Sequence, residues 1–204
     1  MYSACVFLPL IAAFISGFFG RIIGDRAAQI VTSSALVISF FISLLILNDV
    51  AFEGNVYQVQ LLTWISSGSF EVSWALQFDS LTAVMVFVVT IVSSVVHIYS
   101  IGYMAHDDCK TRFMSYLSLF TFAMLTLVTS DNFLQLYFGW EGVGLCSYLL
   151  IGFWYQKPSA NAAAIKAFIV NRVGDFGFAL GIFLIFYYFG TVNYSEVFAQ
   201  IPFI

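Results

Sequence analysis

Long apolar stretches alternate with short polar ones along this chain. Because a transmembrane helix needs about 20 apolar residues, the candidate spans lie at 3–22, 28–48, 80–103, 113–129, 132–155 and 161–189. The pattern predicts an all-α protein with six transmembrane helices. No linker and no internal repeat divides these stretches, so we expect a single transmembrane domain over residues 1–204.

The longest polar interval, between the second and third apolar stretches, has a different pattern. Apolar residues occupy every second position over Phe70–Phe78, after a turn-like sequence at 66–69, and a weaker alternation covers 56–62. A period of two is typical of β-strands. We therefore expect a β-hairpin on the membrane surface. The alternative is an irregular interfacial loop anchored by Trp64 and Trp74.

Composition supports a membrane location. Hydrophobic residues make up 61% of the 204 positions and charged residues 9%, and the mean hydropathy is +0.96. A soluble domain needs a larger charged surface, so membrane lipids are the expected surroundings. The net charge of −4 is spread without a basic cluster, which argues against nucleic acid as a partner. No cleavable signal precedes the first helix, which we expect to remain in the mature protein.

Apart from Lys166 and Arg172, the basic residues lie at alternate connections. Arg21 and Arg26 follow the first span, Lys110 and Arg112 follow the third, and Lys157 follows the fifth, whereas the other connections hold neither Lys nor Arg. Short loops rich in Lys and Arg stay on the cytoplasmic or matrix side of a membrane. The asymmetry therefore predicts that the N-terminus and the hairpin face the outer (P) side.

Four charged residues fall inside the fifth and sixth spans, where each costs about 2.5 to 3.5 kcal/mol unless it has a partner or a task. Counted from the loop that joins these spans, Glu141 and Asp175 both lie about 21 Å along their helices. Arg172 and Asp175 are three residues apart and can pair on one helix face. Glu141 is then left without a cation, so it would either be neutral or meet a cation from elsewhere, and in both cases it could take up and release a proton. The alternative is a purely structural role for all three.

The fourth charged residue, Lys166, and His97 in the third span have open roles. Lys166 lies about two turns into the sixth span, so it could have a function or simply extend to the interface. His97, in the inner part of the third span, could relay protons or only hydrogen-bond a neighbouring helix.

The sequence contains no recognisable set of residues for redox or metal chemistry. The three cysteines, Cys5, Cys109 and Cys146, are too far apart in sequence to indicate a disulfide framework or a metal site. The sequence also contains no phosphate-binding loop, dinucleotide fingerprint, iron–sulfur motif or paired-histidine haem site. We expect no cofactor on this chain.

The strongest sequence signal is FLQLYFGWEGVG at 133–144, followed by SYLLI at 147–151. It resembles helix five of antiporter-like subunit 5 of respiratory NADH:ubiquinone oxidoreductase, complex I. The segments AIKA at 164–167 and NRVGDFG at 171–177 are similar to its helix six, and FDSLT at 78–82 and VHIYS at 96–100 to its helix three. The resemblance covers nearly the whole chain but only about the first third of the family's length.

This resemblance implies a function in the proton-translocating membrane arm of complex I, in the mitochondrial inner membrane or a bacterial plasma membrane. Glu141 would carry protons, Lys166 would lead toward the inner side, and Arg172 with Asp175 would tune Glu141. NADH, flavin, iron–sulfur clusters and ubiquinone would be bound by other subunits. The expected partners are the other membrane-arm subunits, including a second chain that carries the rest of this subunit and a buried lysine.

Two rival functions are compatible with the same sequence. One is the large subunit of a multi-subunit cation/proton antiporter, which shares the motifs of helices five and six. The other is a scaffold that supports assembly and conducts no ions.

The predicted topology can be tested by labelling. A single cysteine introduced into the 49–79 loop should react with a membrane-impermeant thiol reagent added on the outer side, because the positive-inside rule places that loop there. A matched cysteine beside Lys157 should be protected from the same reagent. Labelling of the loop from the inner side alone would contradict the orientation.

Overall fold

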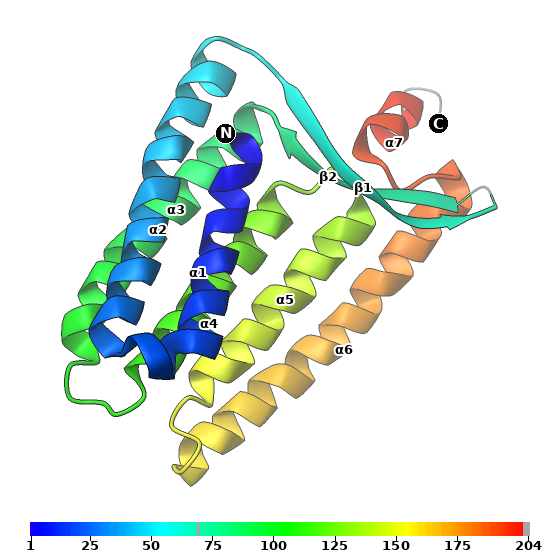
Figure 1. The fold of residues 1–204 in the computed structure, drawn as a ribbon. Coiled ribbons are helices and arrows are strands. Elements are labelled where there is room, and N and C mark those ends of the chain that lie inside the picture. The colour runs from blue at the N-terminus through cyan, green and yellow to red at the C-terminus, as the bar shows by residue number, and fades with distance from the viewer. Residues whose placement is uncertain (69, 202–204) are drawn as a thin grey trace.

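The computed structural model describes residues 1–68 and 70–201, and Figure 1 shows its ribbon. Its elements are, in chain order, α1 (Tyr2–Ile23), α2 (Asp25–Leu47), the short π-helix η1 (Asn48–Phe52), β1 (Tyr57–Ser67), β2 (Phe70–Phe78), α3 (Ser80–Tyr103), α4 (Lys110–Val128), α5 (Phe133–Ile151), α6 (Pro158–Phe189) and α7 (Tyr194–Gln200).

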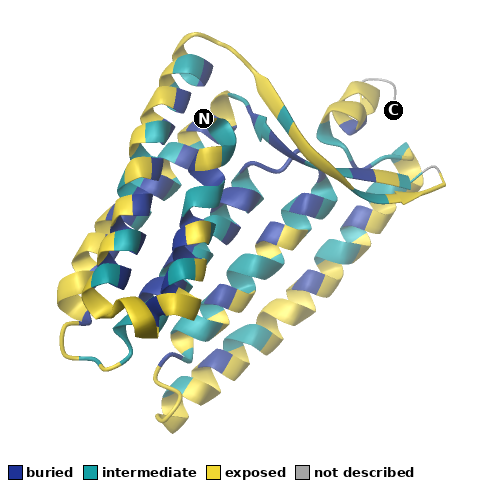
Figure 2. Cartoon of the chain, viewed as in Figure 1, coloured by how far each residue is buried: buried dark blue, intermediate teal, exposed yellow. Residues whose placement is uncertain are grey.

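The six long helices stand side by side, and the hairpin lies across one end of them (Figure 1). Helix α1 packs against α2 and α4, α3 packs against α2 and α4, and α5 lies between α4 and α6. Helix α6 is at the edge of the bundle, so much of its surface is exposed (Figure 2). The predicted helical membrane fold with a hairpin between the second and third helices is confirmed.

Five helices in the described part of the chain are long and apolar enough to cross a membrane, namely α1, α2 with η1, α3, α4 and α6. Helix α5 has 19 residues, among them the polar Gln135 and Glu141, which lower its hydropathy. It lies against α4 on one side and α6 on the other. Its position in the bundle therefore supports the sixth predicted span, although its composition alone is weaker.

Local caps explain where the helices begin and end. Asp79 accepts a hydrogen bond from the backbone of Thr82 at 2.8 Å and starts α3. Pro158 takes the first position of α6, where its missing N–H costs nothing. Helix α6 therefore starts three residues before the predicted 161, and α5 stops at Ile151 instead of the predicted 155. The short helix α7 was not expected from the sequence.

The structure contains the predicted β-hairpin and not the alternative, an irregular interfacial loop. Strands β1 and β2 pair antiparallel from Tyr57 opposite Phe78 to the turn, with two register irregularities in between. The rings of Trp64 and Trp74 pack against each other at a tilt of 54°, with centroids 5.1 Å apart. The centroid of the Trp74 ring lies 4.8 Å from that of Phe138 on α5. The two tryptophans thus fix the hairpin to α5.

Polar contacts fasten the hairpin to the start of α5 as well. Asp131 is buried and accepts hydrogen bonds from Gln58 Nε2 at 3.0 Å and from Asn132 Nδ2 at 2.6 Å. The buried side chain of Gln135 accepts a hydrogen bond from the backbone N–H of Ala75 at 3.1 Å. Because buried polar groups need partners, these contacts set the height of α5 relative to the hairpin.

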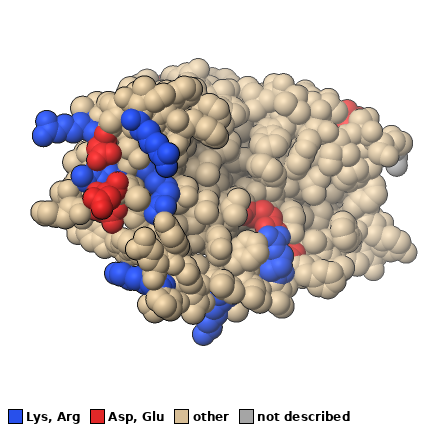
Figure 3. Space-filling model, turned by 60° about the horizontal axis from the view of Figure 1, so that its bottom comes forward, with Lys and Arg blue, Asp and Glu red and all other residues tan. Residues whose placement is uncertain are grey.

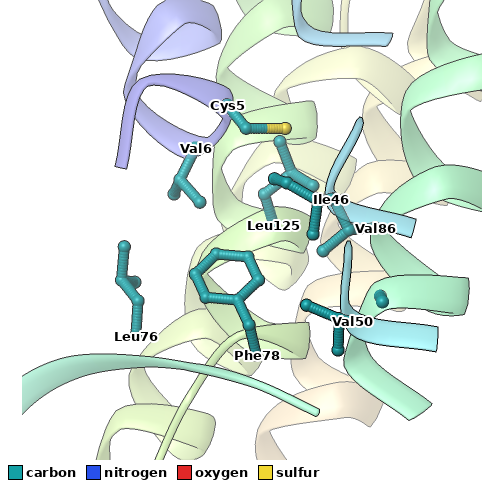
Figure 4. Close-up of a cluster of buried hydrophobic side chains, with 9 residues drawn as sticks. Cys5, Val6, Ile46, Val50, Leu76, Phe78, Val86 and Leu125 are labelled. Carbon is teal, nitrogen blue, oxygen red and sulfur yellow. The ribbon is translucent and has the colours of Figure 1, made fainter. Parts of the chain in front are cut away.

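Beneath the hairpin, residues from α1, α2, η1, β2, α3 and α4 form one apolar cluster (Figure 4). Phe78 is completely buried there, next to Cys5 from α1 and Leu125 from α4. Cys5 is therefore a packing residue. The cluster consists of Cys5, Val6, Ile46, Val50, Leu76, Phe78, Ala83, Val86 and Leu125.

Close packing between α4 and α5 yields a prediction. A Cβ added at Gly139 would lie 2.6 Å from the Cα of Leu127, whereas a Cβ at Gly144 would meet nothing within 4 Å. Gly139→Ala should therefore destabilise the assembly that contains this chain by about 1–3 kcal/mol through overpacking. Thermal unfolding of the purified assembly measures it, with Gly144→Ala as the matched control. Equal stability of the two variants would contradict this packing.

Candidate functional site

Glu141 and Arg172 meet between α5 and α6. They are 31 residues apart in sequence, yet Arg172 Nη1 donates a hydrogen bond to Glu141 Oε1 at 2.6 Å. The two helices run antiparallel from the connection that precedes Pro158. Their side chains therefore meet across the interface between α5 and α6.

Asp175 completes the cluster from the next turn of α6. Its Oδ2 lies 3.9 Å from Arg172 Nε, and its Oδ1 accepts a hydrogen bond from the indole N–H of Trp140 at 2.8 Å. The side chain of Asp175 is 7% exposed, that of Glu141 23% and that of Arg172 51%. The closer and more direct contact of Arg172 is thus with Glu141.

This geometry corrects one inference from the sequence. Glu141 was expected to lack a cation because Arg172 would pair with Asp175. In the structure Arg172 binds Glu141 directly and Asp175 more loosely, since the Trp140 indole already occupies one Asp175 oxygen. The predicted pair of Arg172 and Asp175 is present, but spacing on one helix cannot show that a neighbouring helix offers a closer carboxylate, and this is why Glu141 was wrongly left without a cation.

The cluster holds two carboxyl groups and one guanidinium. When both acids are ionised it carries one negative charge, and binding one proton makes it neutral. In an apolar slab the neutral form is favoured by desolvation, whereas the guanidinium favours the charged form. The two carboxylates therefore share one guanidinium.

Trp140 is the member of the cluster that the sequence did not reveal. A tryptophan in an apolar helix is ordinarily a packing residue or an interfacial anchor. One signal was available, because an indole N–H away from water needs an acceptor. Nothing in the spacing showed that the acceptor is Asp175.

Lys166 and His97 lie outside the contacts of this cluster. Lys166 is exposed on α6, nearer the start of the helix, and takes part in none of the ion pairs among the described residues. His97 is completely buried between α3 and α4. Its Nε2 lies 3.0 Å from Ser118 Oγ and its Nδ1 2.8 Å from the carbonyl oxygen of Ser93. The structure therefore brings together three of the five predicted site residues.

Comparison with known proteins places these features in a family. Residues 64–114 match the family model described as NADH-Ubiquinone oxidoreductase (complex I), chain 5 N-terminus. Residues 130–203, which contain the whole charge cluster, match the model described as NADH:quinone oxidoreductase/Mrp antiporter, TM. The chain belongs to the antiporter-like subunit 5 family of complex I.

Relatives in this family are similar over nearly the full chain. NADH-quinone oxidoreductase subunit L of Rickettsia conorii is 55% identical over 94% of this chain and 29% of its own length. NADH-ubiquinone oxidoreductase chain 5 of Chondrus crispus is 54% identical over 99% of this chain and 30% of its own length. The chain thus spans about three tenths of the length of these curated relatives.

Solved structures share the fold at low identity. A chain of the membrane-bound sulfane sulfur reductase, an archaeal respiratory membrane complex, superposes with a TM-score of 0.82 at 17% identity, over 96% of this chain and 39% of that one. A chain of the Mrp complex from Dietzia sp. DQ12-45-1b gives 0.71 at 22% identity, over 96% and 20%. At these identities the likeness concerns the fold alone.

The ion pairs predict unequal effects for the two cations of α6. Arg172→Ala removes the cation from both carboxylates and should cause a several-fold loss of assembled complex, because it leaves Asp175 buried without a charge partner. Lys166→Ala removes an exposed cation that forms no ion pair among the described residues, so its effect on assembly should be small. Native gel electrophoresis of membrane extracts measures both. Similar losses in the two variants would mean that the pairing with Arg172 does not support assembly.

Proposed function

We propose that this chain is part of the proton-translocating membrane arm of complex I. The observation that supports this most directly is the arrangement of one guanidinium between two carboxylates inside the apolar slab. Several kcal/mol are needed to keep such charges in a membrane, and intramembrane charges of this kind mark ion paths. The first relatives named above are NADH-quinone and NADH-ubiquinone oxidoreductase subunits.

In this proposal Glu141 is the group that takes up and releases the proton. While Arg172 lies against Glu141, the ion pair stabilises the carboxylate. When Arg172 moves to Asp175, Glu141 loses its cation in an apolar setting and takes up a proton. Redox energy released elsewhere in the complex would drive this exchange. Lys166 lies on the way from the cluster to the start of α6. His97 forms a separate polar contact between α3 and α4.

The remaining assignments follow from the same proposal. No redox group is bound by this chain, and NADH, flavin, iron–sulfur clusters and ubiquinone belong to other subunits of the complex. The location is the mitochondrial inner membrane or, for a bacterial source, the plasma membrane, with the N-terminus on the outer (P) side. Other membrane-arm subunits and membrane lipids are the partners.

The exposed face of α6 gives these partners a place. Only 11% of the most apolar part of α6 is buried, against 33–39% for the other four apolar helices. Half of the Arg172 side chain is exposed on this helix, and a guanidinium facing lipid is costly. We infer that the rest of the subunit covers this face, where a buried lysine would approach Glu141. That a separate chain supplies this part stays a prediction.

Substitution of the two acids tests the proposed function. Glu141→Gln should leave assembly intact and lower proton translocation by an order of magnitude or more, because the amide cannot carry the proton. Asp175→Asn should have a milder effect, since Asp175 only competes for Arg172. Proton uptake into vesicles that contain the purified complex, driven by NADH oxidation, measures both.

The same experiment separates the rival functions. Normal pumping by Glu141→Gln would favour the scaffold. A complex that copurifies without flavin and iron–sulfur proteins and exchanges cations for protons would favour the antiporter. Mass spectrometry of the assembly in mild detergent identifies these companions, and also shows whether a second hydrophobic chain with an intramembrane lysine is present.

A further inference from the structure

A cavity of about 410 Å³ lies between α4, α5 and α6, at the end of the bundle opposite the hairpin. Figure 3 looks onto this end and shows that Lys and Arg side chains are spread over it. The cavity lies apart from the Glu141 cluster, whose residues do not line it. The residues that line it include one arginine, three tyrosines and two apolar side chains: Arg112, Tyr116, Tyr148, Tyr155, Leu149 and Ile165.

Arg112 is held rigidly in the wall of this cavity. Its Nη2 donates a hydrogen bond to the backbone carbonyl of Phe153 at 3.1 Å. The guanidinium carbon lies 4.7 Å from the centroid of the Phe153 ring and 5.4 Å from that of Tyr155. The two rings and the carbonyl fix the plane of the guanidinium before any ligand arrives. Such a preorganised fork is suited to an anion with several oxygens.

The donors of Arg112 are largely unused. A guanidinium has five N–H groups, and Arg112 makes one hydrogen bond with the described residues and no ion pair with them. Its Nε is buried without a partner. With several unused donors beside a cavity, Arg112 can bind an acceptor that the described part of the chain does not supply.

The neighbouring acid does not fill this role. Asp107 shares a second, smaller cavity with Arg112 but does not line the one between α4, α5 and α6. Its carboxylate accepts hydrogen bonds from Trp154 Nε1 at 2.9 Å and from the backbone N–H of Cys109 at 2.8 Å. The bond from Trp154, more than any other influence, lowers the pKa of Asp107. Among the described residues that line the larger cavity, Arg112 is the one charged side chain.

The position of the cavity indicates what kind of anion would bind. Tyrosines and tryptophans gather at the headgroup level of membranes, and Tyr155 and Trp154 lie at this end of the bundle. The apolar side chain of Ile165 on α6 is 51% exposed and also lines the cavity. A ligand in this place meets a fixed cation at one end and an apolar wall at the other. Basic pockets between transmembrane helices are suited to anionic headgroups.

We propose that this cavity binds an anionic phospholipid, with its phosphate on Arg112 and an acyl chain along Leu149 and Ile165. The absence of a carboxylate among the described lining residues disfavours the choline group of a zwitterionic lipid, which would need one. Free phosphate shares the chemistry of the headgroup but makes no use of the apolar wall. The proposal is independent of proton translocation by Glu141, so either can fail alone.

Lipid retention tests the site on the complete complex. The complex is purified in mild detergent, reconstituted with phosphatidylcholine containing phosphatidylglycerol, repurified, and the phosphatidylglycerol bound to it is quantified by mass spectrometry. Arg112→Gln should weaken retention about tenfold, equivalent to about 1.4 kcal/mol. Lys110→Gln is the matched control: it removes the same charge from the same helix outside the cavity and should retain the lipid.

A second variant keeps the test valid if Arg112→Gln fails to assemble. Ile165→Trp should fill the apolar side of the cavity and reduce retention with Arg112 in place. Ile169→Trp, one turn along α6 and similarly exposed, lies outside the lining residues and should not reduce it. Retention that is unchanged in both cavity variants would overturn the site. Equal retention of phosphatidylcholine, or displacement of the lipid by inorganic phosphate alone, would overturn its assignment to an anionic lipid.

Discussion

A single guanidinium shared between two carboxylates on neighbouring helices is the interaction on which the rest of this structure depends. Without Arg172, Glu141 on α5 and Asp175 on α6 would bring two acids together in an apolar slab, and at least one would become neutral. With it, the two helices are joined by an ion pair. The same atoms thus form a structural contact and the proposed proton site.

The position of this cluster is set from elsewhere in the fold. The hairpin holds the start of α5 through the buried Asp131 and Gln135, and through the edge-to-face contact of Trp74 with Phe138. Below that contact, Gly139 allows α5 to lie directly on the backbone of α4. Two residues further along is Glu141. The hairpin therefore acts as a fixed reference for the height and rotation of the helix that carries the acid.

Helix α6 has the opposite character. It packs on α5 along one side and leaves most of its surface exposed, so it is the natural place for contact with the parts of the family's length that this chain does not span. Its two ends also differ. The hairpin end packs aromatic side chains, such as Phe186 against Phe70, whereas the basic end borders the cavity of Arg112. A movement of α6 would therefore change both the charge cluster and this cavity.

The sequence alone determined the membrane fold, the hairpin and the candidate acids, because each depends on local periodicity, on the distribution of Lys and Arg or on charge in an apolar run. Helix ends were placed less well, since caps such as Pro158 decide them within a few residues. Only the tertiary structure decided the pairing of Arg172 with Glu141, the hydrogen bond from Trp140 to Asp175 and the separation of His97 from the cluster. The physical reason is that spacing shows which residues share a helix face, whereas the choice between two carboxylates depends on how far apart and how rotated two helices are.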